Sequence, residues 1–205
     1  MQAVETSFFQ YSTTEITYLT QADKILGEAI NRIGKVERVI IPDLFPALIY
    51  AIIGQQVSVK AVHTIWNRMQ ERFDEITPKN ISNISKHEIQ QCGMTIRKSG
   101  YIKGIADRVA QGDLDLNQLY NLSDKEVIKQ LSSLHGIGIW TAEMLLLNSM
   151  ERPNIVSFGD IAIKRGMMKL YGLSELTKEQ FDEYKNRYSP YGSVASIYLW
   201  KLSCE

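Results

Sequence analysis

The feature that most constrains this chain is a turn with two glycines between two segments of helical periodicity. The turn lies in the sequence LHGIGIWTA, which runs from Leu134 to Ala142. Glycine has no Cβ, so the backbone at Gly136 and Gly138 can come very close to another molecule. The helix that starts near Ile139 presents unpaired N–H groups, which favour an anion such as a phosphate. Two helices joined in this way are suited to hold a nucleic-acid backbone without reading a base.

A single carboxylate, Asp160, follows the turn and opens the next helical pattern. An aspartate just before a helix is commonly a simple cap, because its oxygen accepts hydrogen bonds from orphan N–H groups. The same hydrogen bonds favour the charged form of a carboxylate. Asp160 is therefore a candidate both for capping and for stabilising positive charge.

Helical patterns account for most of the chain. Apolar residues recur at helical spacing in 23–33, and residues 45–54 are almost all apolar, as in a helix that is buried on most sides. Only residues 8–18 and 38–41 look extended, and neither is a convincing strand. Helix starts are indicated at Ser58, Ser85, Thr95, Ser123, Thr177 and Ser193. The sequence predicts an all-α protein.

The charge balance limits what kind of nucleic-acid binder this chain can be. It has 23 basic and 23 acidic side chains among 205 residues, so its formal net charge is zero. Strong non-specific binders of DNA are usually clearly basic. Basic residues gather in 97–108 and again at Lys164, Arg165 and Lys169. We therefore expect a modest basic rim, with backbone amides supplying part of the phosphate binding.

The cysteine content and the apolar runs narrow the class further. Cys92 and Cys204 are too few for a disulfide framework or for a four-thiolate iron–sulfur cluster. No apolar run approaches the length of a membrane span, and residues 1–5 lack the features of a signal peptide. The histidines are scattered and indicate no transition-metal site: His63, His87 and His135. These features predict a cytoplasmic protein without a membrane partner.

Four stretches together resemble the helix-hairpin-helix DNA glycosylase superfamily, most nearly its DNA-3-methyladenine glycosylase II group. They are AIIGQQVSV at 51–59, LHGIGIWTA at 134–142, FGDIAIK at 158–164 and YLW at 198–200. The resemblance implies an all-α, two-lobed fold in which the N-terminal β-domain common in this group is missing or vestigial. Residues 1–205 would form a single glycosylase module. Lobe one would span about 44–150, including the hairpin at 127–149, and lobe two about 15–43 with 151–205.

The resemblance also implies an activity, that of a monofunctional DNA glycosylase of base excision repair. Such an enzyme, acting as a monomer on damaged double-stranded DNA, hydrolyses the N-glycosidic bond of a flipped-out alkylated purine of the 3-methyladenine type and leaves an abasic site. Asp160 would be the catalytic residue, because a fixed anion stabilises the oxocarbenium-like transition state. Relatives that also cut the strand carry a nucleophilic lysine at the position of Trp140, and tryptophan has no such nitrogen.

Several further residues receive a role from the resemblance. Trp140, Trp200 and Met144 match base-pocket positions, where aromatic faces attract a cationic base. Met144 stands where family members can carry a tyrosine, and both tryptophans could instead be core residues. Gln56 matches the wedge that fills the gap left by the flipped base, against the alternative of an ordinary surface glutamine. Gln55 is expected to tie the loop backbone together.

The remaining assignments concern the DNA backbone and a metal ion. Backbone contacts are expected at Gly136, Ile137, Gly138, Thr141 and Lys164. The main-chain carbonyls of Ser132, Leu134 and Ile137 are implied ligands of a monovalent cation, Na or K, because hard cations prefer oxygen. No other cofactor and no iron–sulfur cluster are expected. Two alternatives stay open: a non-catalytic helix-hairpin-helix DNA-binding module, and a glycosylase for deaminated or oxidised purines.

Overall fold

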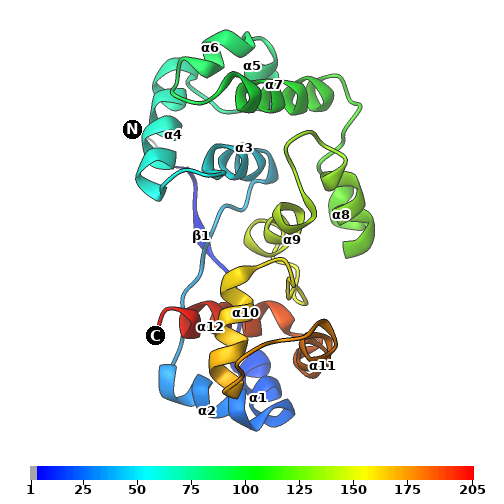
Figure 1. Cartoon of the computed structure of the whole chain (residues 1–205). Helices are drawn as coiled ribbons and strands as arrows, with labels where there is room; N and C mark the ends of the chain where they lie inside the picture. Colours follow the sequence, from blue (N-terminus) through cyan, green and yellow to red (C-terminus); the bar gives the residue numbers. More distant parts are fainter. Residues whose placement is uncertain (1–3) are drawn as a thin grey trace. The chain divides into compact units, whose positions relative to one another are not determined.

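The computed structural model describes residues 4–205, and the elements in that range are almost all helices (Figure 1). The expectation of no signal peptide in residues 1–5 falls partly on residues 1–3, which lie outside the described residues. The chain divides into two compact units. Unit 1 contains Ile41–Leu145 and the described residues up to Ser7, and unit 2 contains Phe8–Ile40 and Leu146–Glu205. The predicted all-α class is confirmed. Within residues 4–205, no helix is long and apolar enough to cross a membrane.

Unit 1 holds the central run of helices. They are α3 (Leu44–Gly54), α4 (Val59–Phe73), α5 (Pro78–Ser82), α6 (Lys86–Gln90), α7 (Ile96–Ala110), the 3₁₀ helix η1 (Gln118–Asn121), α8 (Asp124–Ser132) and α9 (Ile139–Asn148). The last three residues of α9 belong to unit 2. Helix α3 is buried along most of its length, as its apolar sequence predicts.

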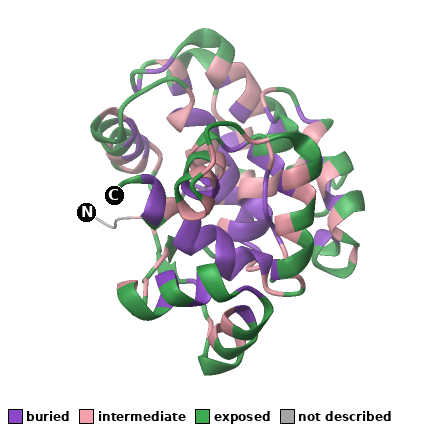
Figure 2. Ribbon diagram, turned by 60° about the horizontal axis from the view of Figure 1, so that its bottom comes forward, coloured by how far each residue is buried: buried purple, intermediate pink, exposed green. Residues whose placement is uncertain are grey.

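Unit 2 combines the beginning of the chain with its C-terminal third. Its helices are α1 (Thr13–Ala22), α2 (Lys24–Ile33), α10 (Ile161–Tyr171), α11 (Lys178–Tyr188) and α12 (Gly192–Ser203). Two short strands, β1 (Ser7–Phe8) and β2 (Val39–Ile40), pair with each other. Buried residues dominate α12, which runs through the core of this unit (Figure 2).

Side-chain caps start most of the helices where the sequence predicts them. The side-chain oxygens of five predicted caps each accept a hydrogen bond from an amide of the first turn: Ser58, Ser85, Thr95, Ser123 and Thr177. Each cap satisfies an N–H group that would otherwise lack a partner. Three of these caps, Ser85, Ser123 and Thr177, form complete capping boxes.

Two local predictions are wrong. Residues 8–18 look extended, yet Thr13–Ala22 is a helix whose start is fixed by a capping box of Ser12 and Glu15. Ser193 does not cap α12, because that helix begins one residue earlier, after Tyr191. The Ser193 hydroxyl instead donates to the Arg152 carbonyl at 2.5 Å and accepts from the Ile155 amide at 2.9 Å. The Ser193 hydroxyl thus holds the loop at 152–155.

Gly166 allows the backbone of α10 to lie close against α12 in unit 2. A Cβ built on Gly166 of α10 would lie 2.0 Å from the carbonyl oxygen of Leu199 on α12. No side chain fits in that space, so glycine is required there for steric reasons. The contact fixes α10, which Asp160 caps, relative to the turn of α12 that carries Trp200.

Gly166→Ala is expected to lower the free energy of unfolding by about 1–3 kcal/mol or more, because the added methyl group overlaps backbone that cannot move aside. Gly100→Ala in α7 is the matched control, since a Cβ there meets nothing within 4 Å. That control should gain about 0.5–1 kcal/mol from the better helix propensity of alanine. Urea unfolding of both variants checks the prediction, and equal stabilities would contradict it.

Candidate active site and nucleic-acid interface

Asp160 lies at the N-terminus of α10 and is 6% exposed. Its Oδ1 atom accepts hydrogen bonds from the amides of Ala162 at 2.8 Å and Ile163 at 2.9 Å. The positive end of the helix dipole lies at the same place and favours a negative charge. The local structure therefore orients a carboxylate and stabilises its charge, which confirms the capping half of the sequence interpretation.

Trp200 lies on α12 in the same unit and is half-buried. The guanidinium of Arg38 lies over its ring, with Cζ 4.2 Å from the ring centroid. The Nε atom of Arg38 also donates to Oδ1 of Asn148 at 2.9 Å. Burial lowers the pKa of Arg38, and the nearby Asp160 carboxylate opposes that shift. Unit 2 thus brings an aromatic ring, a cation and a carboxylate into one neighbourhood.

Arg38 is a site residue that the sequence interpretation missed. It precedes β2 in a short extended segment, where an arginine usually points into solvent. No motif or spacing distinguishes it from the other basic residues of the chain. Its position becomes visible only when the N-terminal segment packs beside α12.

In unit 1 the glycine turn between α8 and α9 has the tight geometry that its sequence predicts. Gly136 has a φ of +89°, a conformation that side chains rarely adopt. A Cβ on it would lie 2.3 Å from Cδ2 of Tyr101 in α7. The Tyr101 ring also stacks against His135. Gly138 has open space around it, so its missing side chain serves no packing need inside the protein.

The loop after α3 is tied to this turn. The Gln55 side chain donates from Nε2 to the carbonyl of Gly136 at 2.7 Å, which confirms the expectation that it holds loop backbone. Lys98 of α7 donates from Nζ to the carbonyls of Ile53 at 2.8 Å and Gln55 at 2.5 Å. Gln56, the next residue in this loop, is exposed and has a φ of +57°. Such a conformation is uncommon for a non-glycine residue and is often found at functional sites.

The other predicted contact residues differ in exposure. Trp140 is 47% exposed at the start of α9, so it is not a core residue, and Met144 one turn later is half-buried. Ile137 and Thr141 are buried. The Nζ atom of Lys164 lies 4.8 Å from the centroid of the Phe158 ring. The roles of these predicted contact residues toward DNA stay predictions.

Of the four basic residues predicted to form a modest rim in 97–108, Arg97 and Arg108 are exposed, while Lys98 and Lys103 are engaged within unit 1. Lys98 binds main-chain carbonyls, and burial lowers the pKa of its ammonium group. Lys103 binds the Ser82 carbonyl at 2.8 Å and forms an ion pair with Asp107. Arg97 donates to the hydroxyl of Tyr101. Lys98 and Lys103 therefore join separate segments of unit 1, whereas the Arg97 bond stays within α7.

Metal-ligating side chains do not gather anywhere in the part of the chain that the structure describes. No group of three or more histidine, cysteine, aspartate or glutamate residues there could hold an ion. Cys92 is buried and Cys204 is exposed, and both are free thiols.

Comparison with known proteins decides the family. Residues 49–190 match the family model described as HhH-GPD superfamily base excision DNA repair protein. The chain belongs to this superfamily. HhH-GPD here denotes the helix-hairpin-helix, the glycine- and proline-rich loop and the aspartate, and the match includes three of the four stretches on which the resemblance was based. The sequence-based family prediction is confirmed.

Individual HhH-GPD relatives are similar over most of the chain. DNA-3-methyladenine glycosylase 1 of Schizosaccharomyces pombe is 31% identical over 164 residues, which cover 78% of this chain and 72% of the relative. A DNA-3-methyladenine glycosylase of Bacillus subtilis is 26% identical over 197 residues, covering 90% of this chain but 65% of the relative. The chain therefore spans about two thirds of the length of that curated relative.

Solved structures of HhH-GPD proteins have the same fold. A DNA-3-methyladenine glycosidase from Bacillus halodurans matches with a TM-score of 0.85 and 30% identity, covering 97% of this chain and 92% of that one. A 3-methyladenine DNA glycosylase from Schizosaccharomyces pombe, in complex with abasic DNA, matches with a TM-score of 0.79 and 27% identity, covering 92% and 95%. The all-α helix-hairpin-helix glycosylase fold is thereby confirmed.

Gly136→Ala is expected to lower the stability of unit 1 by about 1–3 kcal/mol, because alanine is strained at this φ and its methyl group meets the Tyr101 ring. Gly138→Ala is the matched comparison and should change stability by less than about 0.5 kcal/mol. Thermal and urea unfolding measure both. A Gly136→Ala variant as stable as the Gly138→Ala variant would show that the turn tolerates a side chain.

Proposed function

We propose that this protein is a monofunctional DNA glycosylase that hydrolyses the N-glycosidic bond of flipped-out alkylated purines and leaves an abasic site. The observation that carries the proposal is the Asp160 carboxylate. It is nearly buried, oriented by two helix amides and located in the segment that matches the HhH-GPD family. The names of the relatives support a substrate of the 3-methyladenine type. Damaged double-stranded DNA is the proposed partner of a monomeric enzyme.

The proposed chemistry uses the charge of Asp160. As the bond between C1′ and the base nitrogen breaks, its electron pair leaves with the base and positive charge builds on the sugar. A carboxylate held in place by Ala162 and Ile163 stabilises that charge without having to reorganise. Water then attacks C1′ and loses a proton, to which Asp160 can serve as acceptor. Alkylation at N3 or N7 makes the base a cation, so it can leave without a general acid.

Unit 1 supplies the proposed grip on DNA. The target nucleotide must leave the base stack before its sugar can reach a carboxylate. Gln56 is exposed on a loop that is fixed by Gln55 and Lys98, which suits a wedge that fills the vacated space. Gly138 lets a phosphate approach the amides at the start of α9, since no side chain surrounds or covers it. Gly136, Ile137 and Thr141 complete the proposed backbone contacts of unit 1, and Lys164 is the one proposed contact from unit 2.

A monovalent cation at the hairpin is part of the proposal. The proposed ligands are main-chain carbonyl oxygens, the kind of donor that hard cations prefer. The Leu134 carbonyl accepts one hydrogen bond, from the Ile137 amide at 3.1 Å, which uses one of its two lone pairs. The carbonyls of Ser132, Leu134 and Ile137 would hold the ion. When bound, it would supply positive charge to a DNA phosphate.

Asp160→Asn is expected to slow base release at least about a hundredfold, since it removes the charge that stabilises the transition state while keeping the shape of the side chain. Asparagine is as good a helix cap as aspartate, so the fold should be preserved. The measurement is the single-turnover release of methylated purines from DNA, with alkaline cleavage of the abasic product. Affinity for abasic-site DNA should stay largely intact.

Asp43→Asn is the matched control for this variant. Asp43 also caps a helix, accepting from the Phe45 amide at 3.0 Å, but it lies in unit 1 and has no proposed catalytic role. The Asp43→Asn variant should release bases at the wild-type rate. Unchanged release by Asp160→Asn would reject the catalytic role. No release by the wild-type protein across a panel of lesions would favour a non-catalytic DNA-binding module.

The reaction product should be an intact strand with an abasic site. Trp140 offers no nucleophilic nitrogen for attack on C1′, so no Schiff base should form. DNA treated with the enzyme should break only after alkali, and borohydride should trap no covalent adduct. A strand break without alkali would instead indicate a bifunctional glycosylase for oxidised purines.

A further inference from the structure

The Trp200 ring, which is expected to attract a cationic base, already has a cation on one face. The Arg38 guanidinium lies 4.2 Å from the ring centroid, well inside the range of a cation–π interaction. Its Nε hydrogen bond to Asn148 holds the guanidinium from a second direction. A base that stacks on Trp200 must therefore use the other ring face or displace Arg38.

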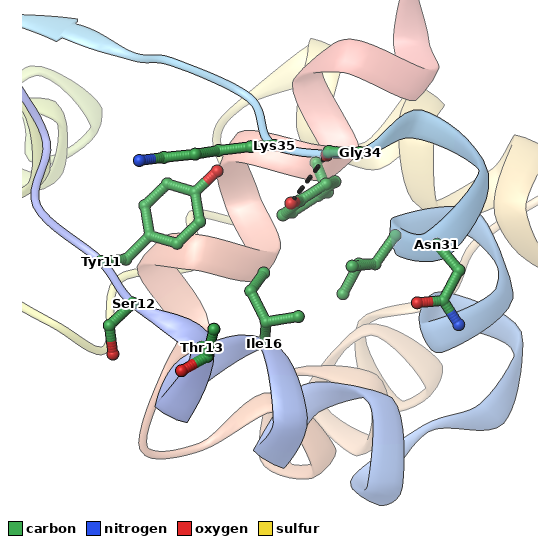
Figure 3. Close-up of a pocket in the computed structure, with 9 residues that line it drawn as sticks. Tyr11, Ser12, Thr13, Ile16, Asn31, Gly34 and Lys35 are labelled. Atoms are coloured by element: carbon green, nitrogen blue, oxygen red, sulfur yellow. Dashed lines mark hydrogen bonds between the residues drawn. The ribbon is translucent and has the colours of Figure 1, made fainter.

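Arg38 is held by its backbone as well as by its side chain. The segment that leads to it lies beside a pocket of about 560 Å³ in unit 2 (Figure 3). The Tyr198 hydroxyl donates to the Gly34 carbonyl at 3.0 Å, and the Tyr11 hydroxyl bonds both the carbonyl and the amide of Val36 at 2.6 and 2.9 Å. The Phe9 amide donates to the Arg38 carbonyl at 2.9 Å. These bonds fix the chain on both sides of residue 37.

This pocket is not itself a candidate binding site. Its lining includes none of the residues predicted to bind DNA or a base. At the N-terminus of α1, beside this pocket, the Glu15 carboxylate already accepts a hydrogen bond from the Ser12 amide at 2.8 Å as part of the capping box. Two of its lining residues, Tyr11 and Tyr198, instead bond to the segment before Arg38.

We propose that Arg38 is a specificity-determining residue, whose fixed positive charge on Trp200 disfavours cationic bases relative to neutral ones. The inference deepens, and rests on, the proposed glycosylase function. It assigns to this protein a stronger preference for neutral damaged purines, such as hypoxanthine and ethenoadenine, than a bare tryptophan platform would give. Cationic 7-methylguanine and 3-methyladenine remain substrates, with their advantage reduced.

The first argument is electrostatic. A base stacked on the opposite face of Trp200 would lie roughly 8 Å from the guanidinium, given normal stacking distances. Two positive charges at that separation in a partly buried site repel appreciably, because little water screens them. The cation–π attraction that Trp200 offers is also shared with Arg38. Asp160 is near enough to Arg38 to affect its pKa, yet the guanidinium stays protonated in proteins and keeps its charge.

The second argument, from hydrogen bonding, applies to the other geometry, in which the base takes the ring face under Arg38 and the guanidinium moves to the edge of the base. A guanidinium has several N–H donors and no acceptor. With Nε bound to Asn148, its remaining donors suit the ring nitrogens and carbonyl oxygens of a neutral purine. Methylation at N3 or N7 removes one of these acceptors and adds a positive charge. Both effects act in the same direction.

The test compares release of cationic 7-methylguanine with release of neutral hypoxanthine from otherwise identical DNA under single-turnover conditions. Arg38→Met keeps an apolar side chain over the ring and removes the charge. It should raise the ratio of the cationic rate to the neutral rate about tenfold. Arg38→Lys keeps the charge and should leave the ratio close to that of the wild type.

Arg32→Met is the matched control. Arg32 is exposed in the same unit and pairs with Glu205 at 2.8 Å. Its loss should leave the rate ratio unchanged. A merely structural role of Arg38 would lower both rates together and leave their ratio where it was, and that result would overturn the proposal. A ratio that falls in Arg38→Met would overturn it as well.

A binding measurement separates this inference from the proposed reaction. In the Asp160→Asn background, affinities for DNA carrying one 7-methylguanine or one hypoxanthine are compared with and without Arg38→Met. The second substitution should improve relative binding of the cationic lesion, whether or not the protein releases bases. An unchanged affinity ratio contradicts the role of Arg38, while failure of the wild type to release any base contradicts only the proposed glycosylase function.

Discussion

The geometry of the candidate catalytic residues depends on the contact between Gly166 and Leu199. At this point the backbones of α10 and α12 touch. A Cβ on Gly166 would lie only 2.0 Å from the carbonyl oxygen of Leu199, so the position admits a hydrogen atom but no side chain. Asp160 caps the first of these helices, and Trp200 follows Leu199 on the second. A carboxylate and an aromatic ring that derive from different helices are thereby held by rigid backbone. Sites built on packed helices keep their geometry better than sites built on loops.

In unit 1, polar bonds fix the loop after α3 and the hairpin turn between α8 and α9. Gln55 links the loop after α3 to Gly136 in the hairpin turn, and Lys98 binds the last carbonyls of α3. Those carbonyls would lack partners at the end of a helix, and a cation there also suits the helix dipole. The loop that carries Gln56 is thus fixed by polar bonds, while Gln56 itself stays exposed. Rigid support with an exposed tip is what a wedge residue requires.

The sequence predicts much of this arrangement, because its signals are local. Helix caps such as Ser58 and Ser123 act within one turn, and the glycines of the hairpin are required by backbone conformation. Helix α1 is missed because its apolar residues are sparse, with Leu19 alone buried, so that its periodicity is weak. Arg38 is missed for a different reason. Its partners Asn148 and Trp200 lie more than a hundred residues away, and no local pattern encodes a contact of that kind.

The use of positive charge connects these observations. Lys98 and Lys103 bind carbonyls inside unit 1, and the chain as a whole has zero net charge, so a broad electrostatic attraction to DNA is not expected. Helix amides are neutral groups that release no counterions from DNA, and a grip that relies on them weakens less with salt than one built on lysines. Selectivity then depends on individual charges in fixed positions. Arg38 is such a charge, because in the role we propose one guanidinium over Trp200 would change which bases the ring accepts without adding to non-specific binding.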